Sequence, residues 1–285
     1  MLGNLTYVAP FIITNGMTTY ALSKMSEKKL IARFQNIKTL KAKDVKEKPT
    51  VPNEIKELVT IIEESVDKSY LNNLYNNLIS VKIKKNLPLV LLGIKGKYDN
   101  QYNTLDYSIK GSIEHELIHL SSACYDAESG MCQSGFVYYD KNFTLCKALN
   151  EGYTDLTARR LFDKKTTFYN GEVRLAQFFE LLFDKNELQK YYFTNDLRSF
   201  INRLSTFVER EEAIKMLIKF ELGFNLKKWG NPAYKIIYTN LELKLSKIFA
   251  NTKKPIDKQF DHINLLGDSP ITKTIQKIKK PYVTM

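Results

Sequence analysis

The sequence is poor in the residues and segments that mark disulfide-rich, secreted and membrane-spanning proteins. Its 285 residues include three cysteines, three histidines and one tryptophan. So few cysteines, and an odd number of them, exclude a disulfide scaffold and are typical of free thiols in a reducing compartment. No apolar run has the ~20 residues that a membrane-spanning helix needs, and the N-terminus lacks the basic start of a signal peptide. We therefore expect a soluble, cytoplasmic protein with no transmembrane segment, unless it is exported by a route that uses no signal.

Acidic residues are also in the minority. The chain has 43 Lys and Arg against 31 Asp and Glu, a formal net charge of +12. An excess of this size can favour a nucleic acid or an anionic membrane as partner. The lysines are spread along the whole chain, however, and no arginine-rich block occurs, so solvated helix faces explain the charge more simply. A nucleic-acid partner is therefore neither excluded nor favoured.

Three regions with different patterns follow one another along the chain. Residues 1–88 are basic and mostly helical in pattern, with one helix expected from about 53 to 79. Residues 89–170 contain short β-prone segments and two helical stretches, which predict a small mixed sheet and a pair of helices. Residues 171–285 have amphipathic helical periodicity almost throughout. The sequence therefore predicts an α+β fold with a mostly helical C-terminal half.

Two parts of the middle region have more specific predictions. Turn residues at 98–103 separate two β-prone segments, so a hairpin is expected directly before the next helix. Residues 126–145, with Gly130 and Gly135, are expected to form a loop that holds one short hairpin at 135–140. In the C-terminal region, the aromatic run 191–193 is expected to lie in the core.

The stretch SIEHELIHLSSACYD (112–126) contains two of the three histidines, His115 and His119, with Glu116 between them. If this stretch is helical as far as Cys124, that thiol faces the core, while both imidazoles share another face because they are four residues apart. Two neutral imidazoles so placed can bind one Zn²⁺, with the glutamate turned toward the water at the metal. A surface helix with paired histidines and a solvated glutamate is the alternative that this stretch alone leaves open.

A second helical stretch, ALNEGYTDLTARRLF (148–162), adds a carboxylate to the two histidines. Glu151 as a third ligand would leave the fourth position of a tetrahedral zinc open, as a catalytic site requires. Asp155 lies one turn beyond Glu151, where its carboxylate could accept the second ring N–H of a ligating histidine. An ordinary acidic helix face, with Asp155 paired to Arg159, is the alternative for this segment alone.

HELIH followed by NEGYTD resembles the gluzincin metallopeptidases, the thermolysin-like group, and within it small zincins that combine HELxH with LNEGYT. The resemblance covers about residues 89–163. It implies a zincin-like fold and one zinc ion, with His115, His119 and Glu151 as ligands. It also implies that Glu116 is the general base, that Asp155 supports a ligand histidine, and that the segment before the HELIH helix is an edge strand that aligns an extended peptide.

The resemblance further implies a hydrogen-bond donor from the C-terminal half that stabilises the oxyanion of the attacked carbonyl. His262 and the many tyrosines are candidates, and the sequence does not distinguish among them. A structural role is the simpler interpretation of His262. The spacing of Cys132 and Cys146 fits no standard structural zinc site.

These patterns predict a zinc-dependent metallopeptidase, in the first place an endopeptidase, that hydrolyses a peptide or protein substrate with Glu116 as base. Two alternatives stay open. One is a catalytically silent zincin-fold protein that binds or regulates a partner, and the other is a zinc hydrolase of a non-peptide amide. If the basic C-terminal half forms the far wall of the site, acidic or extended polar substrates would be favoured.

Overall fold

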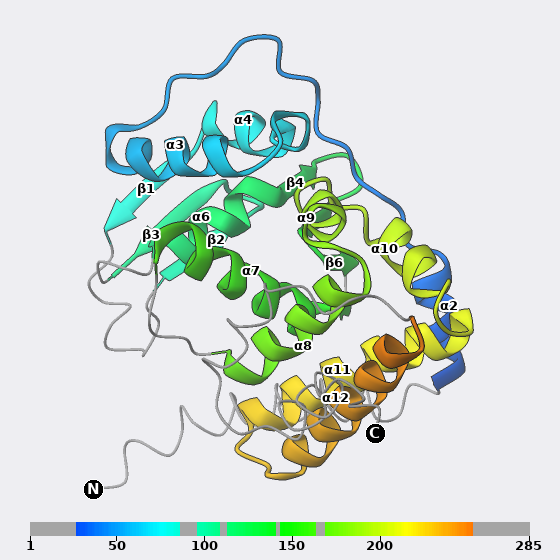
Figure 1. Cartoon of the computed structure of the whole chain (residues 1–285). Helices are drawn as coiled ribbons and strands as arrows, with labels where there is room; N and C mark the ends of the chain where they lie inside the picture. Colours follow the sequence, from blue (N-terminus) through cyan, green and yellow to red (C-terminus); the bar gives the residue numbers. More distant parts are fainter. Residues whose placement is uncertain (1–26, 86–95, 109–112, 141–142, 164–168, 253–285) are drawn as a thin grey trace, which may run out of the picture.

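The computed structural model describes residues 27–85, 96–108, 113–140, 143–163 and 169–252. Within them the chain is an α+β protein, mostly helical, with two small sheets (Figure 1). No helix in these residues is long and apolar enough to cross a membrane. A continuous buried core includes residues from Ile31 near the start of this part to Phe249 near its end.

The N-terminal helices differ from the single long helix that the sequence predicts. After α2 (Glu27–Gln35) the chain runs without regular structure to a 3-10 turn, and then forms α3 (Lys56–Ser65) and α4 (Asn72–Leu78). The break lies at Val66 and Asp67. Val66 is extended, and the Asp67 carboxylate accepts hydrogen bonds from the backbone N–H and hydroxyl of Ser69. This local side-chain bonding begins a new 3-10 turn in place of continued α-helix.

The first sheet is small and mixed, as predicted. Its strands are β1 (Lys82–Lys85), β2 (Gly96–Asp99) and β3 (Thr104–Tyr107), in the order β1-β3-β2. The predicted hairpin is confirmed, because β2 and β3 pair in antiparallel fashion around the turn that follows Asp99. β1 pairs with β3 in parallel, and β2 ends the sheet among the described strands.

The second sheet lies where the sequence predicts a loop with one hairpin. Its four antiparallel strands are β4 (Ala123–Asp126), β5 (Met131–Ser134), β6 (Val137–Asp140) and β7 (Phe143–Leu145). Gly130 and Gly135 have positive φ and make two of its turns. Cys124 is buried as predicted, but it lies on β4 and not on the preceding helix.

The C-terminal half is helical, as expected. It consists of α8 (Asn170–Leu182), α9 (Lys185–Phe193), α10 (Leu197–Leu204), α11 (Arg210–Lys228) and α12 (Ala233–Asn251). The aromatic run at the end of α9 supplies core residues, with Tyr192 and Phe193 fully buried.

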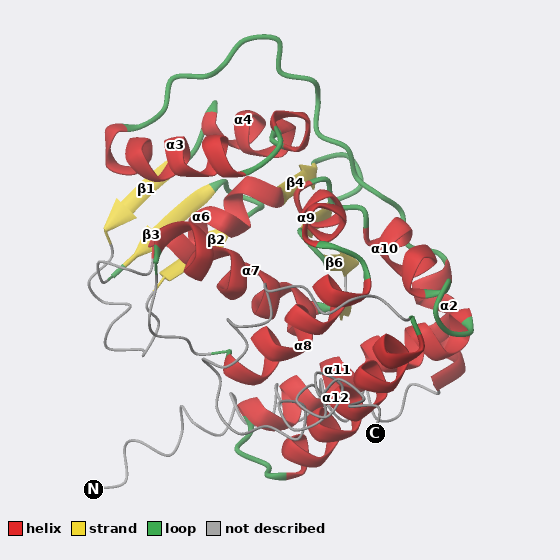
Figure 2. Ribbon diagram, viewed as in Figure 1, coloured by secondary structure: helices red, strands yellow, loops and turns green. Residues whose placement is uncertain are grey.

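Two helices, α6 (Ile113–Ser122) and α7 (Lys147–Phe162), occupy the middle of the molecule. In Figure 1, α3 and α4 lie on one side of this pair, and α8, α11 and α12 lie on the other. Figure 2 shows one small sheet on each side of α6. Both central helices are thus held from several directions, which fixes the position of the side chains between them.

Candidate metal centre

Helix α6 presents a core face and a polar face, as its sequence predicts. Ile113, Leu117 and Leu120 are buried at helical spacing. His115, Glu116 and His119 lie on another part of the helix and are partly exposed.

Helix α7 is buried on nearly all sides. Every residue from Ala148 to Ala158 is buried except Glu151, because α3, α6, α8 and α11 pack around the helix. Gly152 permits close packing against α8, since a Cβ at this position would clash with the backbone oxygen of Glu172. A helix packed this tightly carries Glu151 to a defined place beside α6.

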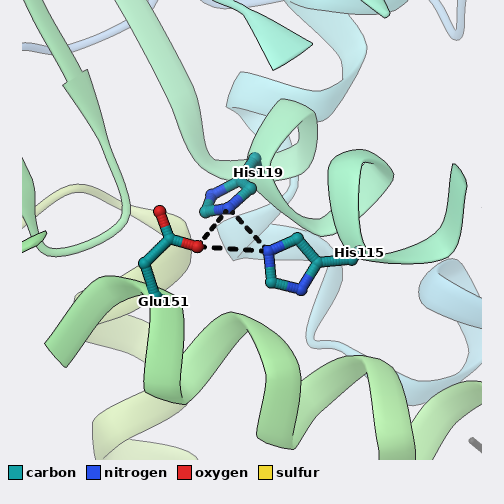
Figure 3. A group of neighbouring side chains, drawn as sticks. All are labelled: His115, His119 and Glu151. Atoms are coloured by element: carbon teal, nitrogen blue, oxygen red, sulfur yellow. Dashed lines mark hydrogen bonds and ion pairs between the residues drawn. The ribbon is translucent and has the colours of Figure 1, made fainter. Parts of the chain in front are cut away.

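The two predicted motifs meet in space, and their three candidate ligand side chains point at one another (Figure 3). The two Nε2 atoms of His115 and His119 are 3.1 Å apart. One carboxylate oxygen of Glu151, Oε2, lies 3.3 Å from Nε2 of His115 and 3.6 Å from Nε2 of His119. The three side chains are 12–15% exposed, so the site is largely desolvated but not closed.

The dimensions of this triangle fit a metal ion. With metal–ligand bonds of ~2.0–2.1 Å, two ligands of a tetrahedral zinc lie about 3.3–3.4 Å apart. The three measured separations, 3.1, 3.3 and 3.6 Å, bracket that value. Two imidazoles and one carboxylate are also a donor set typical of catalytic zinc. Among the described residues this is the group of His, Cys, Asp and Glu side chains that can hold a metal ion.

The partners of His119 direct its Nε2 toward the triangle. Its Nδ1 lies 3.4 Å from the hydroxyl of Thr154, which donates to the backbone oxygen of Asn150. The Tyr192 hydroxyl is 2.6 Å from the same Thr154 oxygen. Since the Thr154 proton is already donated, its oxygen is an acceptor for the other two groups. The Thr154 hydroxyl thus lies against Nδ1 of His119, which keeps Nε2 on the side of the ring that faces the triangle.

Asn150 completes the support of His119. Its Oδ1 accepts the backbone N–H of Phe136, which fixes the amide so that Nδ2 lies 3.3 Å from Nδ1 of His119. Phe136 directly follows the turn at Gly135, where a Cβ would clash with the Tyr192 ring. The second sheet therefore contributes to the site through this turn.

Asp155 lies beside His115, as predicted. Its Oδ1 is 3.8 Å from Nδ1 of His115, and its Oδ2 is 3.9 Å from Nε of Arg159. The carboxylate thus contacts both groups that the sequence offers it, the histidine and the arginine. It is placed to hold the Nδ1–H tautomer of His115, which again leaves Nε2 to face Glu151.

The electrostatics of the triangle favour a cation. Burial alone would lower the pKa of His115, but Asp155, Glu151 and Glu116 outweigh burial and raise the pKa to about 10. Burial alone would raise the pKa of Glu151, but the two imidazoles outweigh it and hold the pKa well below its ordinary value. The site therefore stabilises positive charge between these groups, whether it is carried by a proton or by a metal ion.

Glu116 is tied to the first sheet. Its Oε2 accepts the backbone N–H of Tyr98 on β2 at 2.8 Å. Its charge also contributes to the raised pKa values of His115 and Tyr169, so the carboxylate lies close to the triangle. Glu116 is therefore held between the sheet edge and the candidate metal site.

Tyr169 is a site residue that the sequence did not single out. Its ring stacks on His115 with centroids 5.8 Å apart and an interplanar angle of 27°. Burial raises the pKa of Tyr169, and the neighbouring Glu151 and Glu116 carboxylates raise it further, so the phenol keeps its proton. No motif marks this position, because it reaches the site through the packing of α8 against α7. His262, the residue considered for this region from the sequence, lies outside the described residues.

Comparisons with known proteins do not assign the chain to a family or a function. No protein-family model matches the chain, and no curated protein or solved structure matches it. The case for a function therefore depends on the geometry and chemistry of the site.

Proposed function

We propose that the chain is a zinc-dependent metallopeptidase of the gluzincin type, with a zincin-like catalytic core. The observation that carries the proposal is the triangle of His115, His119 and Glu151, with the Glu116 carboxylate on the same helix turn as the two imidazoles. These three residues would hold Zn²⁺. Bound zinc supplies Lewis-acid polarisation of the scissile carbonyl and lowers the pKa of water.

Glu116 is the proposed general base. It takes a proton from the attacking water on its carboxylate and passes that proton to the leaving amine nitrogen. The Tyr98 N–H occupies one of its oxygens, which orients the other for proton transfer. Because β2 ends the sheet among the described strands, an extended peptide could lie along this edge and pass beside the base.

Tyr169 is the proposed donor to the oxyanion of the attacked carbonyl. It has a protonated hydroxyl next to Glu151 and a ring fixed against His115. A donor in such a desolvated place stabilises developing negative charge strongly. Asp155, Thr154 and Asn150 do not touch substrate in this scheme, because they act through the histidines.

The test combines metal content with hydrolysis. Purified protein should contain one equivalent of zinc, and Glu151→Ala should lose it. Glu116→Gln should keep its zinc but hydrolyse casein or a peptide mixture more slowly by about 10²–10⁴-fold, and Tyr169→Phe should lower kcat with little change in KM.

Absence of zinc in the parent protein after reconstitution would refute the metal site. Zinc without hydrolysis would favour the silent binding protein, and hydrolysis of peptidoglycan amides but not of peptides would favour the other alternative.

A further inference from the structure

The outer face of α12 has apolar residues where the outer face of an amphipathic helix is ordinarily polar. The inner face is buried against α8 and α11 and carries Tyr238, Leu241 and Leu245 at helical spacing. On the opposite face Ile236 is 67% exposed and Leu243 is 37% exposed, and the two residues lie two helical turns apart, so they point the same way. The last described helix therefore exposes large aliphatic side chains that the core does not use.

The turn that joins α11 to α12 exposes the one tryptophan of the chain. Trp229 is 43% exposed and caps the end of α11, where Gly230 follows with a φ of 69°. The backbone N–H of Asn231 donates to the oxygen of Leu226 at 3.0 Å, which closes the turn in the way typical of a glycine C-cap. Trp229 and Ile236, in the first turn of α12, are thus fixed at the same end of this helical hairpin. Figure 1 shows α11 and α12 side by side at one edge of the molecule, away from α3 and α4.

The acidic residues of the hairpin are either paired or buried. Glu211 and Glu212 lie at the start of α11, and each forms an ion pair with a lysine of the same two helices. Beyond them, Glu221 and Glu242 are both buried. Residues 213–252 therefore present no exposed carboxylate to solvent.

Lysines adjoin the exposed apolar residues. Lys219 on α11 and Lys235 and Lys247 on α12 are exposed and have no ion pair within the described structure, where the pairs of these helices are made by other lysines. Lys235 precedes Ile236, and Lys247 lies one turn beyond Leu243 on the same face. The surface is therefore both apolar and positively charged.

We propose that the α11–α12 hairpin docks on the surface of an anionic lipid membrane. Trp229, Ile236 and Leu243 enter the boundary between headgroups and acyl chains, and Lys235 and Lys247 face the negatively charged headgroups. A nucleic acid would match the lysines but would leave the exposed aliphatic side chains without a role, because its binding is carried by phosphate contacts. The membrane matches both features. The inference is independent of the proposed peptidase function, because the hairpin contains none of the candidate metal ligands.

The first experiment uses Trp229 as reporter, since the chain has no other tryptophan. The full chain is mixed with vesicles of phosphatidylcholine alone, or of phosphatidylcholine with phosphatidylserine, and tryptophan emission and vesicle flotation are recorded. The expected result is flotation and blue-shifted emission with the phosphatidylserine vesicles only, both weakened as the salt concentration rises. No flotation, equal flotation with both kinds of vesicle, or flotation without a change in emission overturns the proposal.

The second experiment compares the hairpin with matched positions elsewhere on the surface. Ile236→Glu should weaken the affinity for the phosphatidylserine vesicles about tenfold or more, because it removes an inserted side chain and adds a negative charge. Ile79→Glu, at a position that is 64% exposed, should leave the affinity unchanged. Lys235→Glu should weaken binding at least about fivefold, and Lys56→Glu, the same charge change at the exposed start of α3, should have a much smaller effect. Equal losses within either pair would show that the hairpin is not the docking surface.

Two further measurements separate other occupants of this face. A dimer seen by analytical ultracentrifugation that Ile236→Glu dissociates, in a protein that floats with no vesicle, would assign the face to a second copy of the chain and overturn the proposal. Binding of duplex DNA or RNA that Ile236→Glu leaves unchanged, again without flotation, would assign the lysines to a nucleic acid and overturn it as well. Glu151→Ala should float like the parent protein, so failure of the metal centre and failure of membrane docking are distinguishable.

Discussion

Two carboxylates on adjacent helices, the largely desolvated Glu151 on α7 and the fully buried Glu172 on α8, have their lost hydration compensated in different ways. Glu172 is fully buried and has protein partners, with the Lys227 ammonium and the Tyr238 hydroxyl each at 2.6 Å. Glu151 faces two imidazole nitrogens through one oxygen and has no Lys or Arg ion pair in the described structure. A buried carboxylate needs such compensation for its lost hydration.

The difference separates a structural pair from a candidate metal site. The charge of Glu172 is neutralised by a residue of the same chain, so that cluster is complete as it stands. The charge of Glu151 is met by groups that are themselves good metal ligands and are held in place by Thr154 and Asp155. Such a group favours positive charge beside Glu151, carried either by a proton on an imidazole or by a metal ion.

Zinc should give the largest effect. At free zinc of about 1,000 times Kd, the ion should stabilise the parent against unfolding by about 4 kcal/mol, because it binds only the folded site. Glu151→Gln should lose nearly all of this gain, while Glu172→Gln should retain it despite its lower starting stability. The measurement is thermal unfolding with and without zinc. An equal zinc-dependent shift in the parent and in Glu151→Gln would show that Glu151 is not a ligand.

The next effect concerns the structural pair. Glu172→Gln should lower the free energy of unfolding by about 3 kcal/mol, because it leaves Lys227 without its buried partner. The double variant Glu172→Gln and Lys227→Met should recover a large part of that loss, since the ammonium that paired with Glu172 is removed together with the carboxylate. Urea denaturation of the zinc-free proteins measures both. A single variant within ~0.5 kcal/mol of the parent, the range of ordinary surface changes, would refute the assigned role.

The support of His115 should give a smaller effect. Asp155→Asn should weaken zinc binding about 10- to 100-fold, or about 1.4–2.7 kcal/mol, because the amide polarises the imidazole less than a carboxylate does. Competition with a chromophoric chelator measures the affinity. Asp163→Asn makes the same charge change just beyond the end of α7 and should leave the affinity unchanged. If the two variants behave alike, Asp155 has no special part in holding the ligand.

The candidate metal ligands could be predicted from the sequence because their spacing is local. His115 and His119 are one helical turn apart, so a correct helix prediction already places them together. The polar residues of the second motif likewise lie within two turns of one helix, namely Asn150, Glu151, Thr154 and Asp155. This helix is buried, which explains why nearly every one of these residues contacts the site. The distance between the two helices was not predictable, since it depends on packing such as that at Gly152.

Other parts of the molecule depend on contacts that no short pattern records. Tyr169 reaches the site through the packing of α8 against α7. The break between α3 and α4 follows from the hydrogen bonds between Asp67 and Ser69. The sequence did not indicate this break, because the apolar residues at helical spacing continue past Val66. The four-stranded sheet was missed because its strands are short and contain buried polar residues such as Gln133, so they lack a clean alternation of apolar and polar positions.

A third buried carboxylate, Glu221 on α11, sharpens the comparison because it has neither a lysine ion pair nor imidazoles. It accepts the backbone N–H of Ala148, and burial raises its pKa to about 7 from an ordinary value of 4.5. The folded protein therefore keeps a proton on Glu221 over a range of pH in which the unfolded chain has released it. The stability from this group is complete below pH 4.5 and is lost as pH rises toward 7.

The pH dependence of stability caused by Glu221 is the smallest of the expected effects. Between pH 5 and pH 6 the parent should lose about 1 kcal/mol of unfolding free energy relative to Glu221→Gln. The side-chain oxygen of glutamine can still accept the Ala148 N–H, but the amide cannot ionise. The variant therefore keeps this hydrogen bond and loses the pH dependence that the carboxyl causes. Urea denaturation of both proteins at the two pH values gives the difference directly. If the parent instead gains stability relative to the variant as pH rises, Glu221 is ionised in the folded protein, and it belongs with Glu172 as a charged, compensated group.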